Sequence, residues 1–305
     1  MKETIYFKQA ELLLRILPYI EAENVFALKG DTAINFFVRE LPRLSVDIDL
    51  AYIPVSNRDD ALTDISRALK NISLKVKRIF SGCQVSLIKL KDSDFLRKII
   101  ISANDVTVKI EPNLIMRGTV YDPEVMELSQ NAQNSFEMSV SVKALSFSEL
   151  YASKICATLD RQHPRDLFDM HMLLKNEGID KRMHKAFIVY LICHSRPIVE
   201  LLNPNFLDIK PIFENDFVGM TTVNISLEDL LDTRKTLVSS IRESLTNEER
   251  KFLISVKKGK PEWNLLGLTG IEDLPAVKWK LMNIKKMDKK KHKEALEKLR
   301  NYLEK

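Results

Sequence analysis

Residues 28–52, LKGDTAINFFVRELPRLSVDIDLAY, decide the fold, because their pattern predicts a strand, a tight turn, a helix and a second strand. The second strand carries Asp47 and Asp49. Side chains alternate along a strand, so both carboxylates project from the same face. Two neighbouring carboxylates repel each other unless a cation or a shared proton relieves the repulsion. We therefore expect this strand to contribute to a site that holds a cation.

The turn between the first strand and the helix predicts a phosphate site. It consists of Lys29, Gly30, Asp31 and Thr32. Backbone N–H groups at the start of a helix bind phosphate, so the turn and the Thr32 hydroxyl are expected to hold the β- and γ-phosphates of a nucleotide. The sequence contains no GxGxxG or GxxxxGK[ST] string, which argues against dinucleotide-binding and P-loop folds. An anion turn beside two carboxylates favours a metal–nucleotide site.

Composition and length indicate an ordinary globular protein of 305 residues, 45% hydrophobic and 29% charged. This length favours two domains. Three cysteines without a CxxC spacing are typical of a reducing compartment. The N-terminus lacks a signal-peptide pattern, and the longest apolar run is too short to span a bilayer. We expect a cytoplasmic protein that has no contact with membranes.

Positive charge is concentrated in residues 276–305, which hold 11 Lys or Arg against 4 Asp or Glu. The remainder of the chain is slightly acidic, so the net charge of +5 comes from this segment. Two interpretations of its lysines, among them Lys289, Lys290 and Lys291, stay open at this point. They form either a solvated helix face or a contact with the phosphate backbone of RNA.

The periodicity of apolar residues predicts an α/β protein. Helices are expected at 5–22, 32–39, 57–70, 147–162 and 165–176, and strands at 25–29, 45–52, 74–80, 84–90, 97–102 and 106–110, with two further edge strands around 131–135. A hairpin turn is expected at 103–105, and almost only helices follow residue 180. We predict a mixed β-sheet with flanking helices in a catalytic domain, residues 1–180. An all-helical C-terminal domain with a basic tail, residues 181–305, follows it.

A third carboxylate strengthens the prediction of a metal site. Glu111 ends an alternating strand, and its carboxylate would meet Asp47 and Asp49 if the two strands were neighbours. Hard cations such as Mg²⁺ select oxygen ligands, and Glu111 would also help to deprotonate an attacking hydroxyl. Lys154, at the edge of a buried helix stripe, would supply positive charge to a triphosphate. Taken alone, Asp-x-Asp also fits a solvated turn, and Lys154 fits a lysine whose stem covers apolar surface.

The same segments carry a resemblance to a known family. Residues 28–52 resemble the motif KGGTALN…RLSxDIDL of the AbiEii/AbiGii (MenT-like) toxins of the nucleotidyltransferase superfamily. VKIEPN (108–113) resembles the third-carboxylate strand of that family, and ELYASKICATLDRQHPRDLFDM (149–170) resembles its helix with a lysine followed by RDxxDL. Two later segments, 245–263 and 274–284, are similar as well, so the resemblance covers nearly the whole chain.

The resemblance implies a nucleotidyltransferase fold and transfer of NMP from an NTP to an RNA acceptor, tRNA, with release of pyrophosphate. It further implies Mg²⁺, or Mn²⁺ in its place, and a toxin of a toxin–antitoxin or phage-defence system with a cognate antitoxin encoded nearby. The resemblance assigns the metal ligands Asp47, Asp49 and Glu111, the further catalytic residues Lys154 and Asp166, and the phosphate-loop residues Gly30 and Thr32. The predicted turn and the positive charge of the helix add Lys29, Asp31 and Lys154 to the nucleotide-binding residues.

Asp31 departs from the family pattern, because a second Gly usually occupies this position. An acid there would repel phosphate and would lose the freedom to adopt positive φ. A catalytically weak nucleotide- or RNA-binding module therefore stays an alternative, and a glycosyltransferase metal site is a weaker one. Further along the chain, Asp166 is expected to orient Lys154 or Arg161. Asp169 shares a helix face with Asp166 and is expected either to form a surface salt bridge or to have a functional role.

Overall fold

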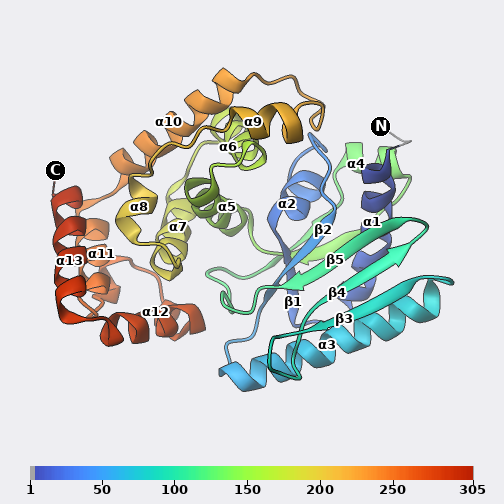
Figure 1. Cartoon of the computed structure of the whole chain (residues 1–305), viewed down its shortest axis with the longest axis horizontal. Helices are drawn as coiled ribbons and strands as arrows, with labels where there is room; N and C mark the ends of the chain where they lie inside the picture. Colours follow the sequence, from blue (N-terminus) through green and yellow to red (C-terminus); the bar gives the residue numbers. More distant parts are fainter. Residues whose placement is uncertain (1–3, 305) are drawn as a thin grey trace. The chain divides into compact units, whose positions relative to one another are not determined.

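The computed structural model describes residues 4–304, shown in Figure 1. The chain forms two compact units. The N-terminal unit holds the residues up to Leu150 together with Met220–Val223, and the helical unit holds Tyr151–Gly219 and the residues from Asn224 onward. The division of the chain into compact units thus falls before residue 180. The proposed limits of a catalytic and a C-terminal domain stay predictions.

A mixed sheet forms the centre of the N-terminal unit (Figure 1). Its strands, in the order β3-β4-β5-β2-β1-β7-β6, are β1 (Phe26–Lys29), β2 (Asp47–Tyr52), β3 (Gln84–Lys89), β4 (Leu96–Ala103), β5 (Val106–Pro112), β6 (Glu124–Glu127) and β7 (Ser141–Ala144). The pairs β1–β7 and β2–β5 are parallel, and the other neighbouring pairs are antiparallel. The predicted mixed α/β fold is confirmed.

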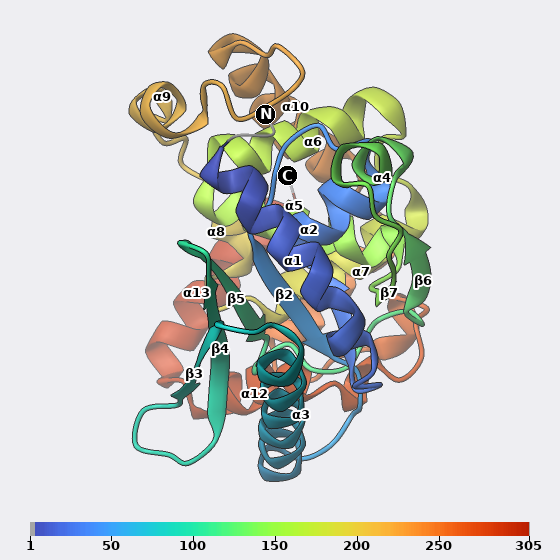
Figure 2. The same cartoon turned by 90° about the vertical axis from the view of Figure 1, so that its right-hand side faces the viewer.

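Two long helices cover the sheet, as Figure 2 shows. They are α1 (Ile5–Glu21) and α3 (Arg58–Ile79), which pack against each other and against the strands. The Asn57 side chain caps α3 by accepting from the backbone N–H of Asp60. The central strand β2 buries Ile48 and Leu50 on its core side, and this leaves Asp47 and Asp49 on its other face. The alternation predicted for this strand is therefore correct.

Two local predictions were wrong, and a third was only partly correct. The strand expected at 74–80 belongs to α3, because Ile65, Leu69, Ile72 and Val76 form one buried helix stripe while Leu74 points to solvent. The two strands expected around 131–135 are present as β6 and β7, on either side of α4 (Gln130–Phe136), and of the two only β6 lies at the edge of the sheet. The helix expected at 32–39 starts two residues earlier as α2 (Gly30–Ala33) and continues as the π-helix η1 (Ile34–Val38).

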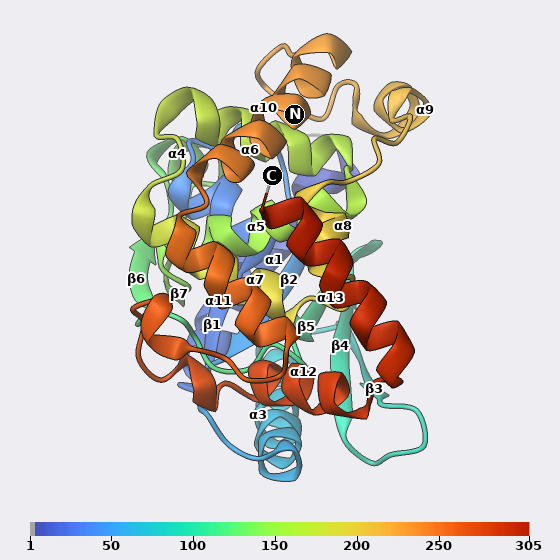
Figure 3. The same cartoon turned by 90° about the vertical axis from the view of Figure 1, so that its left-hand side faces the viewer.

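The helical unit contains only helices and connecting segments among its described residues. The helices are the C-terminal part of α5 (Phe147–Arg161), then α6 (Pro164–Asn176), α7 (Lys181–Cys193), α8 (Ile198–Leu202), α9 (Lys210–Ile212), η2 (Phe213–Phe217), α10 (Leu227–Ser244), α11 (Asn247–Lys257), η3 (Trp263–Leu265), η4 (Ile271–Asp273), α12 (Pro275–Lys286) and α13 (Lys289–Leu303). Helices α11 and α13 lie side by side (Figure 3). The predicted helical C-terminal region is confirmed. No helix within residues 4–304 has the length and apolar character needed to cross a membrane.

Candidate active site

Strand register brings the predicted carboxylates to one place. Strand β2 pairs with β5 in parallel, so Asp49 lies opposite Glu111 and Asp47 opposite Lys109. On its other side β2 pairs with β1, where Lys29 lies opposite Asp49. A lysine and two carboxylates therefore form one row across three adjacent strands. The condition set by the sequence, that the strand of Glu111 neighbours the strand of the aspartates, is met.

A cavity of about 510 Å³ opens beside this row. Its charged lining residues are Lys29, Asp49, Arg58, Arg97 and Glu111. Carboxylates and cationic side chains therefore share one cavity. Such a mixture suits a ligand that brings both a divalent cation and phosphate groups.

The pKa of Asp49 is raised above 3.8, its ordinary value. Burial is the largest cause, because the ionised carboxylate loses hydration. Lys29 opposes this shift, whereas the nearby charges of Asp31, Asp47 and Glu111 add to it. Repulsion among the acidic side chains is thus only partly relieved by Lys29. A bound cation would relieve it further.

Gly30 provides the space that Asp49 occupies. Its φ of +73° lies in the left-handed region, where a residue with a Cβ atom is strained. A Cβ atom added at Gly30 would come within 2.8 Å of Oδ2 of Asp49. The sequence singled out this glycine for its backbone N–H. The structure adds that its missing side chain allows the turn and the Asp49 carboxylate to approach closely.

Thr32 joins helix α2 to strand β2. Its side chain is buried, and its hydroxyl donates to the backbone carbonyl of Asp47 over 2.6 Å. The same hydroxyl shares a 2.8 Å hydrogen bond with the Ser45 side chain. These bonds fix the position at which β2 begins. A direct contact between the Thr32 hydroxyl and a phosphate stays a prediction.

Asp31 forms a salt bridge that the sequence did not reveal. Its Oδ2 lies 2.9 Å from Nη2 of Arg43, whose side chain is almost entirely buried. Asp31 follows Gly30 in helix α2 and, unlike Gly30, does not have a positive φ. The helical backbone means that the second Gly of the family motif is not needed for its φ angle. The guanidinium offsets part of the negative charge that was expected to repel phosphate.

Glu111 is held by two cations of strand β4. One of its carboxylate oxygens lies 3.1 Å from Nη2 of Arg97, and the other lies 3.6 Å from Nζ of Lys98. Across residues 4–304, no three His, Cys, Asp or Glu side chains lie close enough together to hold a metal ion. The carboxylates fit a hard cation by their chemistry. However, Glu111 would have to turn away from Arg97 to join Asp47 and Asp49.

A second cluster surrounds Lys154, in the helical unit. The Lys154 ammonium lies 2.8 Å from Asp166 Oδ1 and 2.7 Å from Asp169 Oδ2, and all three side chains are buried. Arg161 also donates to Asp166, over 2.9 and 3.1 Å. Asp166 therefore contacts both cations that it was expected to orient. The surface salt bridge considered for Asp169 was wrong, although the spacing of three residues between Asp166 and Asp169 already placed them on one helix face.

These features are those expected of a nucleotidyltransferase-like protein: an acidic central strand next to a turn that is predicted to bind phosphate. Among solved structures, the chain is similar to MenT4, a nucleotidyltransferase toxin from Mycobacterium tuberculosis H37Rv, with a TM-score of 0.60. The sequence identity is 13%, and the match covers 92% of this chain and 93% of that chain. A search of the curated proteins finds no match.

The family model described as nucleotidyl transferase AbiEii toxin, type IV TA system, matches residues 11–283. The chain belongs to this family and is a nucleotidyltransferase toxin. Members of the family generally use an NTP and a divalent metal, and a toxin of such a system implies an antitoxin. The resemblance noted in the sequence is confirmed.

Proposed function

We propose that this toxin transfers NMP from an NTP to an RNA acceptor, tRNA, with Mg²⁺, or Mn²⁺ in its place, as the required metal. The observation that carries the proposal is the row of Lys29, Asp49 and Glu111 across three adjacent strands beside a cavity. The acceptor and the choice of metal rest on the family resemblance. Cytoplasmic location, a role in phage defence and a cognate antitoxin as partner belong to the same proposal.

Asp47, Asp49 and Glu111 are the proposed metal ligands. The metal would neutralise negative charge on the phosphates and on the carboxylates. The side chains of this chain have their own tasks. Lys29 and Arg97 line the cavity and would bind phosphate oxygens, and Glu111, once released from Arg97, would accept the proton of the attacking RNA hydroxyl.

Two residues of the turn support this arrangement. Thr32 fixes the start of β2 through the Asp47 carbonyl, and Gly30 leaves room for the Asp49 carboxylate. Thr32 acts through the backbone of β2, and Gly30 acts through the space that its missing side chain leaves. We therefore propose Thr32 as a positioning residue, in addition to the phosphate contact predicted for it.

Lys154 and Asp166 keep their proposed catalytic roles on the basis of the family motif. The geometry adds that Lys154 is neutralised by two buried carboxylates, of Asp166 and Asp169. Replacing Lys154 by Ala would leave both carboxylates buried without that cation, at a cost of about 3–5 kcal/mol. Loss of activity in this variant is informative only at temperatures at which the variant stays folded. Asp166→Asn, which keeps the shape, is the matched comparison.

The decisive experiment incubates the purified toxin with total RNA and each radiolabelled NTP in turn, with Mg²⁺ or Mn²⁺. Asp47→Ala and Asp49→Ala should abolish transfer of label and relieve growth inhibition. Asp122→Ala serves as the control, because Asp122 is an exposed acid of the same unit that lies outside the cavity. Wild-type labelling by the Asp49 variant would refute the proposal.

The alternative of a weak binding module predicts nucleotide or RNA binding without release of pyrophosphate. Its main support was the charge of Asp31 in the phosphate turn. The salt bridge to Arg43 reduces that support. A pyrophosphate assay on folded protein separates the two functions, because only an active transferase releases pyrophosphate. Competition by nucleotide sugars rather than by NTPs would instead favour a glycosyltransferase.

A further inference from the structure

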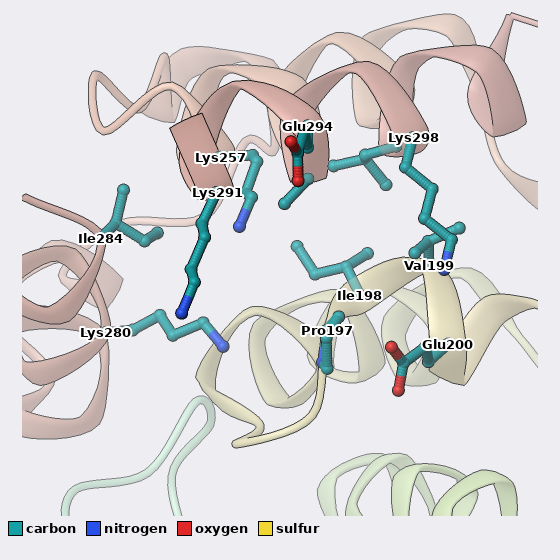
Figure 4. A pocket seen from close by; sticks show the side chains of 12 residues that line it. Pro197, Ile198, Val199, Glu200, Lys257, Lys280, Ile284, Lys291, Glu294 and Lys298 are labelled. Atoms are coloured by element: carbon teal, nitrogen blue, oxygen red, sulfur yellow. The ribbon is translucent and has the colours of Figure 1, made fainter. Parts of the chain in front are cut away.

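The helical unit contains a cavity of its own, of about 280 Å³. Helices α8, α11, α12 and α13 contribute to its lining (Figure 4). Lys257, Lys280 and Lys291 come from three of these helices, and Figure 4 shows their ammonium groups turned toward the same space. The opposite wall includes the apolar side chains of Pro197 and Ile198, beside further charged side chains. The cavity therefore combines a cationic side and an apolar side.

The three lysines lack salt-bridge partners within the described chain. No salt bridge in the described part of the chain includes Lys257, Lys280 or Lys291, although Glu200 and Glu294 also line the cavity. Gathering ammonium groups in one cavity without salt bridges opposes folding, because each ammonium repels the others. A multiply charged anion bound among the three ammonium groups would relieve this repulsion.

Burial of two of these ammonium groups increases the free-energy cost of placing the charges together. Lys257 and Lys280 are half-buried, and burial lowers the pKa of both. The neighbouring charge of Lys257 lowers the pKa of Lys280 further. The Lys280 ammonium donates to the backbone carbonyl of His194, which holds it at the cavity. A side chain that only covered apolar surface would keep its ammonium in water.

We propose that this cavity binds a phosphate group of a nucleotide-sized ligand, with Lys257, Lys280 and Lys291 as its donors. A lysine ammonium is a compact charge with three donors and suits phosphate oxygens. A phosphate dianion matches three cations better than a carboxylate does. The apolar wall would cover the sugar or base attached to that phosphate. The phosphate belongs either to an RNA strand or to a free nucleotide or pyrophosphate.

The test compares two double variants of the full chain. Lys257→Gln/Lys280→Gln removes two ammonium groups of the cavity. Lys285→Gln/Lys286→Gln removes the same charge from the exposed end of α12, outside the cavity, and is the control. Inorganic pyrophosphate binding is measured by calorimetry, and binding of a short single-stranded RNA by fluorescence anisotropy over a series of salt concentrations.

The cavity variant should bind its ligand at least about tenfold more weakly, because hydrogen bonds to charged groups are removed, while the control stays close to wild type. If the ligand is RNA, the slope of log affinity against log salt should also fall by about 0.7 for each phosphate that the protein no longer neutralises. Loss of pyrophosphate binding alone assigns the site to a free phosphorylated ligand. Unchanged binding of both probes overturns the proposal.

Lys291→Gln keeps the test decisive if the double variant fails to fold. The Lys291 side chain is exposed, so its replacement leaves the packing intact. The same affinity change, on a smaller scale, is expected for whichever probe occupies the cavity. Binding to this cavity does not depend on catalysis. A failure of the proposed transfer reaction and a failure of this proposal are therefore separate results.

Discussion

Replacing Gly30 by Ala should damage the active site more than it damages the fold. The new Cβ would lie 2.8 Å from Oδ2 of Asp49, and ordinary contacts begin at 3.4 Å. The carboxylate must therefore retreat by roughly half an ångström, and active-site displacements of about 1 Å can cost about 100-fold in rate. The left-handed φ of +73° adds a backbone cost of about 1–2 kcal/mol. Because the displacement is smaller than 1 Å, we expect a roughly 10- to 100-fold loss in the rate of label transfer.

Gly82→Ala is the matched control, because Gly82 has a φ of +79° and open space where its Cβ would be. Both variants should lose about 1–2 kcal/mol in urea unfolding, and only Gly30→Ala should lose most of its transfer activity. The comparison isolates the collision with Asp49 from the strain in the backbone. Equal activity of the two variants would show that the position of the Asp49 carboxylate does not depend on the glycine.

The other predictions concern charges. Asp49→Asn should raise the free energy of unfolding at neutral pH, because a buried charge is removed. Mg²⁺ should stabilise only the wild type, and stabilisation of both proteins by Mg²⁺ would argue against Asp49 as a ligand. Asp31→Gly should cost about 1.5–3 kcal/mol, because Arg43 loses a carboxylate partner; a gain of transfer activity would mean that Asp31 restrains the enzyme. Burial raises the pKa of Glu249, but hydrogen bonds, led by that from His184, outweigh burial and hold the pKa below 4.5. The contribution of the ionised Glu249 to the free energy of unfolding is therefore complete above pH 4.5 and is lost as the pH falls through the folded-state pKa. Glu249→Gln should be about 1.5–3 kcal/mol less stable than the wild type at neutral pH. In urea titrations at acid pH, the stabilities of the two proteins should approach each other.

Alternation along strands was the part of the site that the sequence could predict. The two-residue period placed Asp47 and Asp49 on one face, and the same period placed Glu111 on the polar face of its strand. Their convergence still required β2 and β5 to be neighbours, because a period describes one strand and not its partner. The structure shows that the two strands are neighbours, with Asp49 opposite Glu111.

Pairings between distant side chains could not be predicted in the same way. The bond between Asp31 and Arg43 depends on how the connection after η1 returns to the turn, and no local pattern encodes that path. The burial of Lys154 depends on the packing of α6 against α5, although the position of the lysine beside the stripe was correct. The strand wrongly expected at 74–80 shows a related limit. A short apolar run fits a helix and a strand equally well until its neighbours are known.

The register of β2 has a genetic consequence. A one-residue shift of a strand moves every side chain to the opposite face. Loss of a single codon between Arg43 and Asp47 would leave the chain two outcomes. Either the shortened connection strains the Thr32 bond that fixes the start of the strand, or the strand shifts by one residue and turns Asp47 and Asp49 toward the core. We expect such an in-frame deletion to lower transfer activity although every acidic codon stays intact.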